Sequence, residues 1–179
     1  MSPEAPLACG TPRGARFPVP HGATSPRISR LAARLATADP AERTMLTAEF
    51  WECAEREGTP LVEAVHDEPA HRAVTFLWRG HRATRQVLLL AEGLTDRDHL
   101  AAGLLTCLPG TEIWYLTFRL RADHRGSYRM VADISPGPRP GTVAQHHSRL
   151  RALTAHAAPD PLNRHVLRGP GPGTESSVF

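Results

Sequence analysis

The side chains that could act as nucleophiles belong to eight serines and three cysteines, with ten histidines available as bases. Hydrolases that use serine usually carry it on a sharp strand-to-helix turn with the pattern G-x-S-x-G. None of the serines has this pattern; the nearest, Ser127, lies in Arg-Gly-Ser-Tyr-Arg and opens an expected strand. A catalytic triad is a matter of three-dimensional geometry, and chance combinations of these residue types occur in any chain of this length. The sequence therefore predicts no catalytic residue.

The cysteines and histidines do not form a metal-binding pattern. Cys9, Cys53 and Cys107 are widely spaced and lack a C-x-x-C pair, so neither a disulfide framework nor a zinc site is expected. His146 and His147 are adjacent, and adjacent side chains on a helix diverge by about 100°. We expect reduced, mostly buried thiols, solvated histidines, no bound metal and no cofactor.

The composition limits the classes of partner. The chain has 179 residues, which suits one domain with flanking extensions. Its 21 basic residues are all arginine, are interleaved with 18 acidic residues, and leave a net charge of +3. Proteins that bind nucleic acids more often concentrate basic residues in a stripe, so no nucleic-acid partner is expected. With no signal-peptide pattern and no apolar stretch near the roughly 18 residues that span a bilayer, we expect a cytoplasmic protein without membrane contact.

One stretch of the chain predicts a strand, a tight turn and a second strand. Residues 111–120 alternate between apolar and polar side chains, and after a tight turn a second strand is expected over 127–133. Threonine and arginine side chains share the outer face of the first strand. The side chains expected on its core face are Trp114, Leu116, Phe118 and Leu120.

Three earlier segments also predict strands, at 61–63, 72–79 and 86–90. Short strands separated by turn signals, with no helices between them, are typical of a β-sandwich and not of a βαβ fold. The predicted fold is therefore mainly β.

Two helices are expected before the strands. Ser25 followed by proline is a helix-start signal, and Asp39-Pro40 with Glu42 is a stronger one. Gly58 should end the second helix. The apolar positions expected to face the protein are Ile28, Leu31 and Leu35 in the first helix, and Leu46, Phe50 and Cys53 in the second.

These patterns divide the chain into four parts. Residues 1–24 are rich in proline and glycine and are expected to form a disordered lead. Residues 25–58 form a helical segment that packs on the sandwich, and residues 59–134 form the sandwich. Residues 135–179 begin with Ser-Pro-Gly-Pro-Arg-Pro-Gly-Thr and are interpreted as a Pro/Gly-rich, linker-like extension with one short helix over 144–157.

Six short motifs follow one another along the chain. They are Phe50-Trp51, Gly58-Thr59-Pro60-Leu61-Val62-Glu63, Val74-Thr75-Phe76-Leu77-Trp78-Arg79-Gly80, Gly110-Thr111-Glu112-Ile113-Trp114-Tyr115-Leu116-Thr117, Arg125-Gly126-Ser127-Tyr128 and Asp160-Pro161-Leu162-Asn163. In this order they resemble the N-terminal domain of enterochelin (enterobactin) esterases over roughly residues 40–168. The resemblance implies an immunoglobulin-like, early-set sandwich that precedes an α/β-hydrolase domain. It also implies cytoplasmic enzymes that hydrolyse ferric tris-catecholate siderophores, with iron present only as part of the ligand.

The sequence departs from this family in one decisive way, because the G-x-S-x-G turn of the hydrolase is absent. The chain stops at Phe179, about where the family's linker would lead into the hydrolase. Arg121, His124 and Arg164 stand where proline, tryptophan and a second proline are usual. We therefore expect a domain that assists ester hydrolysis performed by a hydrolase domain or a separate chain.

The implied ligand is a multiply charged anion with exposed aromatic rings. Guanidinium groups and aromatic side chains would match it, through charge and through stacking. Trp78, Trp114 and Tyr128 fall on apolar faces and are expected to pack in the core instead. The residues hypothesised to bind substrate are Arg79, Tyr115, Arg119 and Arg125.

Three functional classes stay open. The first is the accessory N-terminal domain of a siderophore esterase. The second is a stand-alone module that binds siderophore or carbohydrate without catalysis, for which a flat aromatic platform would favour carbohydrate. The third is an interaction domain that caps a partner enzyme and shapes the mouth of its active site.

Overall fold

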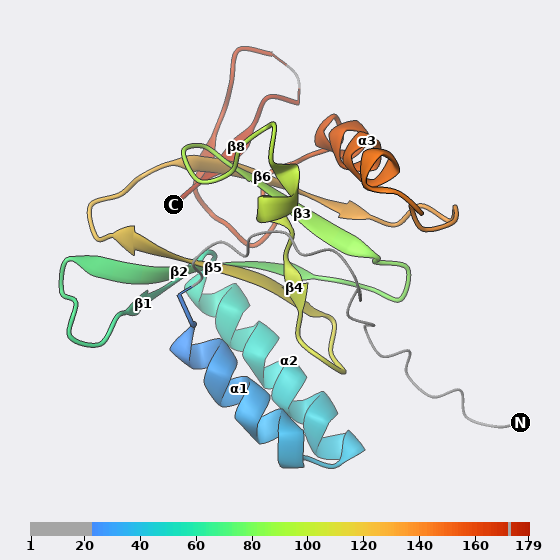
Figure 1. The fold of residues 1–179 in the computed structure, drawn as a ribbon. Coiled ribbons are helices and arrows are strands. Elements are labelled where there is room, and N and C mark those ends of the chain that lie inside the picture. Colours follow the sequence, from blue (N-terminus) through green and yellow to red (C-terminus); the bar gives the residue numbers. More distant parts are fainter. Residues whose placement is uncertain (1–22, 172) are drawn as a thin grey trace, which may run out of the picture.

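The computed structural model describes residues 23–171 and 173–179, so residues 1–22 of the expected disordered lead lie outside the described residues. The described chain forms two four-stranded antiparallel sheets that stack face to face, with helices on their outer sides (Figure 1). This arrangement confirms the mainly β sandwich predicted from the sequence. Among the described residues, no helix combines the length and the apolar character needed to cross a bilayer.

The first sheet contains β5, the strand predicted over residues 111–120, which is paired on both sides. Its strand order is β1-β2-β5-β4. In the β2–β5 pair, Trp78 lies opposite Trp114 and Thr75 lies opposite Thr117. The strands are β1 (Leu61–Ala64), β2 (His71–Arg79), β4 (Thr106–Cys107) and β5 (Ile113–Arg121).

The second sheet combines strands from the middle of the chain with two from its end. Its order is β3-β6-β8-β7, so β8 lies between β6 and β7. The strands are β3 (Gln86–Ala91), β6 (Ser127–Asp133), β7 (Val166–Leu167) and β8 (Ser176–Val178). The sequence indicated loop for the last two, because each is only two or three residues long and is bordered by glycine and proline.

The first two helices start where the capping residues predict, and the second also ends where Gly58 predicts. The Ser25 side chain accepts a hydrogen bond from the backbone N–H of Ile28, and that of Asp39 accepts one from Glu42. Gly58 ends α2 with a φ of 86°, a conformation that side chains resist. The helices are α1 (Pro26–Thr37), α2 (Pro40–Glu57), the short 3₁₀ helix η1 (Leu100–Gly103) and α3 (Val143–Thr154).

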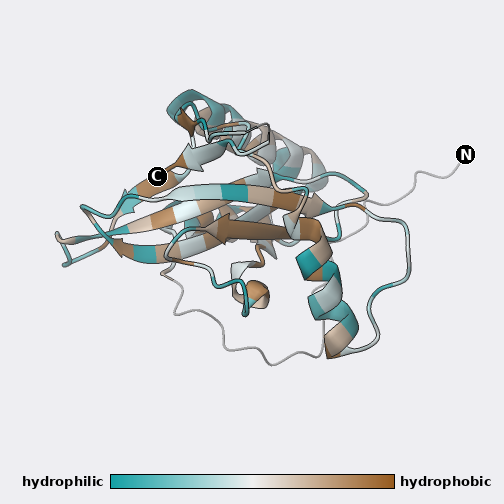
Figure 2. Cartoon of the chain, turned by 90° about the horizontal axis from the view of Figure 1, so that it is seen from above, coloured by the Kyte–Doolittle hydropathy of each residue, from teal (hydrophilic) through white to brown (hydrophobic). Residues whose placement is uncertain are grey.

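Three apolar clusters hold the layers together. The largest aromatic side chains of the middle cluster, around Phe76, Trp114 and Tyr128, lie between the sheets. The α1–α2 pair covers the outer face of the first sheet, and α3 with η1 covers part of the second. Figure 2 shows hydrophobic residues along the central strands and hydrophilic ones in the turns at their ends.

Helix α2 corrects one detail of the predicted apolar face. Leu46 and Phe50 are buried as expected, but Cys53 is only half-buried. Trp51 and Ala54 are buried instead, because α1 and the first sheet contact α2 from two directions.

The outer face of the first sheet is more buried than its polar residues suggest. Thr75 and Thr117 are buried, and their hydroxyl groups form a mutual hydrogen bond of 3.0 Å. A buried hydroxyl is costly only when it lacks a partner, so this cross-strand pair allows helices to cover a face that carries threonine.

Candidate functional site

Arg79 lies at the end of β2, beside helix α2. Its guanidinium carbon is 5.6 Å from the centre of the Trp51 ring, a cation–π contact. Its nitrogens are 3.6 Å from Glu55 Oε1 and 3.7 Å from Glu112 Oε1. The positive charge of Arg79 is therefore balanced by two carboxylates, although its side chain is half exposed.

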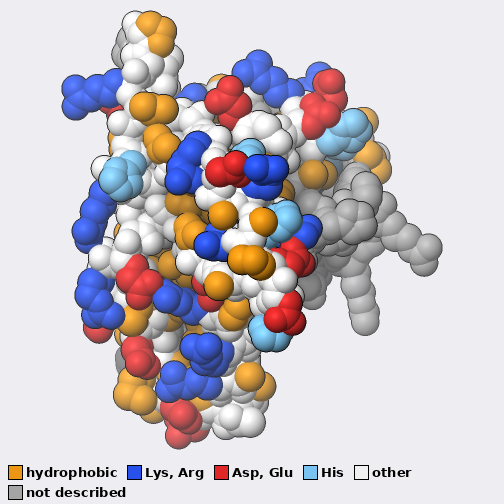
Figure 3. Space-filling model, turned by 90° about the vertical axis from the view of Figure 1, so that its left-hand side faces the viewer, with side chains coloured by type: hydrophobic (Ala, Val, Ile, Leu, Met, Phe, Trp, Pro, Cys, Tyr) orange, Lys and Arg blue, Asp and Glu red, His pale blue; other side chains and the backbone are white. Residues whose placement is uncertain are grey.

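Arg119 lies at the far end of the same sheet face. Its Nε donates a hydrogen bond of 2.6 Å to Glu68 Oε2, and a second nitrogen also donates to this oxygen. The His71 ring contacts the same carboxylate oxygen, with its Nδ1 at 3.1 Å from Glu68 Oε2 and 3.5 Å from the Arg119 guanidinium. Figure 3 shows basic and acidic side chains interleaved over this end of the molecule, where the β1–β2 and β5–β6 turns lie.

Tyr115 and Arg125 have different surroundings. Tyr115 packs against the cluster beneath α1 and α2, so its ring points away from the sandwich interior but is half-buried by the helices. Burial raises the pKa of its hydroxyl, with a smaller contribution from Cys107. Arg125 is exposed in the β5–β6 turn and donates to the backbone oxygens of Ala122 and His124 at 3.4 and 2.8 Å.

The four candidate residues do not form one site. Arg79 pairs across the sheet with Ile113, whereas Arg119 pairs with Ala73 near the other end of the strands. A strand advances by about 3.3 Å per residue, so the two arginines are about 20 Å apart along the sheet. Arg125 lies still further along the chain, in the following turn. A single pocket formed by all four is excluded by this placement.

A buried polar network joins three of the family-like motifs. Asp160 Oδ2 accepts hydrogen bonds of 2.7 Å from the hydroxyls of both Thr59 and Tyr128. Asn163 donates to the Tyr128 hydroxyl at 3.0 Å, and the Asp160 N–H donates to the hydroxyl of Ser177 at 2.8 Å. We call these five residues the Asp160 network. All five are buried, so the network acts in folding and not at a surface site.

Sequence reasoning did not find the Asp160 network. Thr59 and Asp160 are 101 residues apart, and no local pattern links them. One signal was present: each is a small polar residue directly before a proline, inside a motif shared with a family.

The serine that came nearest to a nucleophile pattern has a structural role. The Ser127 hydroxyl is 3.0 Å from Glu92 Oε2 and donates to it, at the start of β6. Within the described residues, no three histidine, cysteine, aspartate or glutamate side chains are grouped to hold a metal ion.

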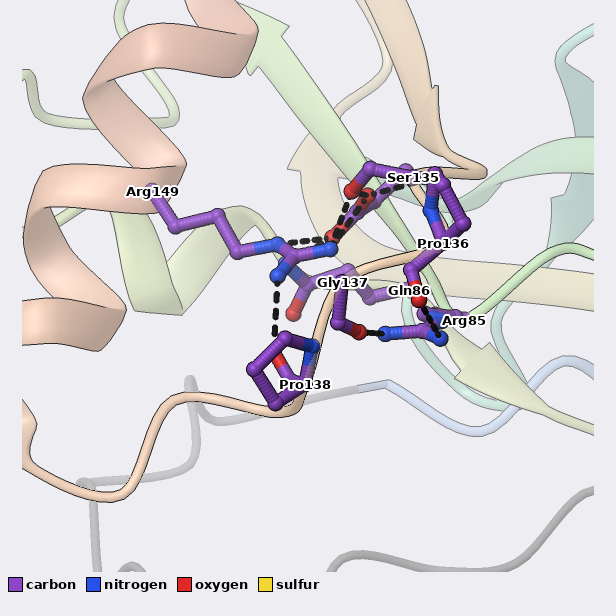
Figure 4. A network of polar contacts seen from close by, with 8 residues as sticks. Arg85, Gln86, Ser135, Pro136, Gly137, Pro138 and Arg149 are labelled. Carbon is purple, nitrogen blue, oxygen red and sulfur yellow. Dashed lines mark hydrogen bonds and ion pairs between the residues drawn. The ribbon is translucent and has the colours of Figure 1, made fainter.

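A groove of about 760 Å³ runs along β6 beside helix α3. At one end, Arg149 of α3 binds Asp133 through two hydrogen bonds of 2.6 and 3.0 Å. Arg85 donates to the backbone oxygen of Pro136, and Arg149 donates to that of Pro138, at 3.2 Å each (Figure 4). The two arginines thus hold the segment that follows β6 in place.

The Asp133 carboxylate is buried beneath this segment. Burial alone would raise its pKa, but the hydrogen bonds from Arg149 and Ser135 outweigh that effect and lower the pKa from 3.8 to about 2. A lowered pKa in the folded state means that the stabilisation is present above pH 3.8 and is lost as the pH falls through about 2.

We expect the Asp133→Asn variant to be less stable than the unmodified protein by about 2 kcal/mol near neutral pH, and equally stable near pH 2. Urea unfolding at a series of pH values measures this difference. A difference that stays constant down to pH 2 would contradict the proposed ion pair.

The comparisons with known proteins match the fold and the motifs. The family described as enterochelin esterase, N-terminal, matches residues 73–179. The iron(III) salmochelin esterase of Escherichia coli O6:H1 is 40% identical over 116 residues, which are 65% of this chain and 28% of that protein. The iron(III) enterobactin esterase of Dickeya dadantii is 32% identical over 130 residues, or 64% and 29% of the two chains.

Solved structures of enterobactin esterases contain a domain with a similar fold. The enterobactin esterase of Shigella flexneri, crystallised in the presence of enterobactin, superposes with a TM-score of 0.54 at 26% identity, over 73% of this chain and 34% of that one. The ferric enterobactin esterase of Salmonella typhimurium gives 0.53 at 27% identity, over 74% and 35%. This chain therefore spans about a third of the length of the relatives that it matches. The matched family covers more than half of this chain and includes β8, so the protein belongs to the enterochelin esterase N-terminal family.

Proposed function

We propose that the protein acts as the accessory N-terminal domain of a ferric-siderophore esterase. The observation that carries this proposal is the family match over residues 73–179. It is supported by relatives named as iron(III) salmochelin and iron(III) enterobactin esterases. The ligand class that follows is a ferric tris-catecholate siderophore, and the chemical step belongs to a partner α/β-hydrolase domain or chain.

The finer proposal concerns which arginine of this domain is available to contact the siderophore. Arg79 and Arg119 have carboxylate partners, so each would have to exchange one anionic partner for another in order to contact the siderophore. Arg125 is bonded to backbone oxygens, which are neutral. Of the arginines in the hypothesised site, Arg125 therefore offers the most uncompensated charge to an approaching anion.

The alternative of a carbohydrate-binding module has less support. Such modules present a flat, exposed aromatic platform to the sugar ring. Among the described residues, every tryptophan, tyrosine and phenylalanine is buried or half-buried. The surface therefore lacks the platform that this alternative requires.

Hydrolysis of ferric enterobactin tests the proposed function. We expect the purified chain alone to release no monomers, and we expect it to raise kcat/KM of a partner hydrolase by about tenfold, which corresponds to about 1.4 kcal/mol. Arg125→Ala should reduce this stimulation. Chromatography of the released catecholate monomers gives the rates.

Arg121→Ala is the matched control for Arg125→Ala, because Arg121 lies beside the same turn but is bonded to Asp123 at 2.8 and 2.9 Å. Equal effects of the two changes would remove the specific role of Arg125. Hydrolysis by the lone chain, or no stimulation of any hydrolase, would refute the accessory role.

A further inference from the structure

Strand β6 is paired along only part of one edge. On the side away from β3, Tyr128 pairs with Ser177 of β8. Met130 then exchanges two backbone hydrogen bonds with Ala158, at 2.8 and 2.9 Å. Beyond Met130, no described residue pairs with this edge, so the strand continues as an open edge to its end at Asp133.

The open edge has unused hydrogen-bonding groups. In an antiparallel ladder, successive residues direct their N–H and C=O groups to opposite sides of the strand. Because Met130 directs its groups toward Ala158, Ala132 must direct its own toward the same side. The N–H and C=O of Ala132 therefore point away from β3, toward the position that an added strand would occupy next to Ala158.

The groove beside α3 surrounds this edge. Trp78 of the first sheet lines one side of it, and Leu153 of α3 lines the other together with His156, which lies two residues beyond the end of α3. Ile134 also lines it and is 53% exposed. A slot between a strand edge and a helix, with apolar side chains on both walls, is the arrangement in which peptides are bound by strand addition.

The charged residues in and beside the groove indicate which kind of polypeptide segment could bind there. Asp133 is the one acidic residue among those that line it, and both of its oxygens are bonded to Arg149. Arg85, which donates to the backbone oxygen of Pro136 in the segment after β6, adds a positive charge beside the groove, and His81 and His156 also line it. A second copy of this chain would bring the same basic groups into opposition, whereas a segment that carries a carboxylate would complement them.

We propose that the β6 edge binds an extended, apolar segment of a partner protein, which carries an acidic residue near Arg85 and Arg149 and pairs with Ala132 as an added strand. This proposal goes beyond the siderophore role and does not depend on it. The backbone bonds would supply affinity, and the apolar walls would select the side chains that enter the groove.

The test uses a short synthetic peptide in which valine and threonine alternate and which ends in glutamate. At millimolar peptide, we expect amide hydrogen exchange at Ala132 to slow by about tenfold, as expected for a newly bonded N–H. The same peptide with an N-methyl group at the pairing amide should lose this effect, and a peptide ending in lysine should bind several times more weakly.

Ala132→Pro provides a variant of the protein itself. Its N–H faces the open edge, so proline removes no internal ladder bond and is tolerated there. Because proline has no amide hydrogen to exchange, binding to the variants is measured by calorimetric titration with the peptide. Ala132→Pro should not bind the peptide, whereas Val166→Thr on the outer edge of the same sheet should bind it normally. The proposal would be overturned if the peptide left the exchange at Ala132 unchanged, or if the N-methylated peptide bound equally well. It would also be overturned, in favour of a second copy, if exchange at Ala132 slowed when the protein alone was concentrated.

Discussion

The Asp160→Ala variant is expected to lose about 4 kcal/mol of free energy of unfolding. Alanine removes the acceptor shared by the hydroxyls of Thr59 and Tyr128 and leaves both buried without it. An unsatisfied buried polar group costs about 1–3 kcal/mol. The backbone N–H of Leu162, which donates to Asp160 Oδ1 at 2.9 Å, also loses its acceptor. Urea unfolding followed by tryptophan fluorescence measures the change.

Two control variants distinguish the loss of the Asp160 network from the loss of a carboxylate elsewhere. Asp160→Asn keeps the acceptor oxygen for the two hydroxyls but places an amide NH₂ group against the N–H of Leu162, so it should lose about 2 kcal/mol, less than Asp160→Ala. Asp123→Ala removes an exposed carboxylate that is bonded to Arg121, and solvent screens such surface pairs, so this change should leave the stability almost unaltered. If Asp160→Ala were no more destabilising than Asp123→Ala, the Asp160 network would not hold the three motifs together.

The Phe179→Ala variant is expected to lose about 3 kcal/mol, as is usual when a packed phenylalanine is truncated. The Phe179 ring lies 5.2 Å from that of Phe76 and 5.9 Å from that of Tyr128, both edge-on, and stacks on His124 at 5.6 Å. The approach is so close that a Cβ added to Gly126 would lie 2.7 Å from Cζ of Phe179. The end of the described chain is thus part of the cluster between the sheets.

Val166→Ala in the neighbouring strand β7 is the matched control, because Val166 is exposed and its truncation should change stability by less than about 0.5 kcal/mol. Thermal or urea unfolding of the two variants gives the comparison. Equal stability of Phe179→Ala and the unmodified protein would mean that residues 176–179 behave as the linker suggested by their composition.

These two predictions concern segments that the sequence places outside the sandwich. The five strands predicted at 61–63, 72–79, 86–90, 111–120 and 127–133 are all present, within about two residues of their expected ends. Alternation and turn signals are local properties, so they are visible in a short window. The pairings of β8 with β6 and of Asp160 with Thr59 join residues far apart in the sequence, and no pattern within a short window predicts which distant segments will meet.

The hypothesised substrate-binding residues were likewise predictable only in part from the sequence. That Arg79, Tyr115 and Arg119 share the face away from the sandwich interior follows from their spacing. Their separation along that face, the Glu68 and Glu55 partners, and the cover that α1 and α2 give to Tyr115 depend on how distant segments pack. Residue type predicted the charge of the candidate site but not what already neutralises it.

The sequence by itself determined the family, the β-rich fold class and the capped helices, because motifs, alternation and capping act within a few residues. Only the tertiary structure decided that the Pro/Gly-rich end supplies a strand and a core phenylalanine, and that β6 keeps an open edge beside α3. The physical reason is that a backbone hydrogen bond or an apolar contact between distant segments depends on the arrangement of the whole chain, which composition does not encode locally.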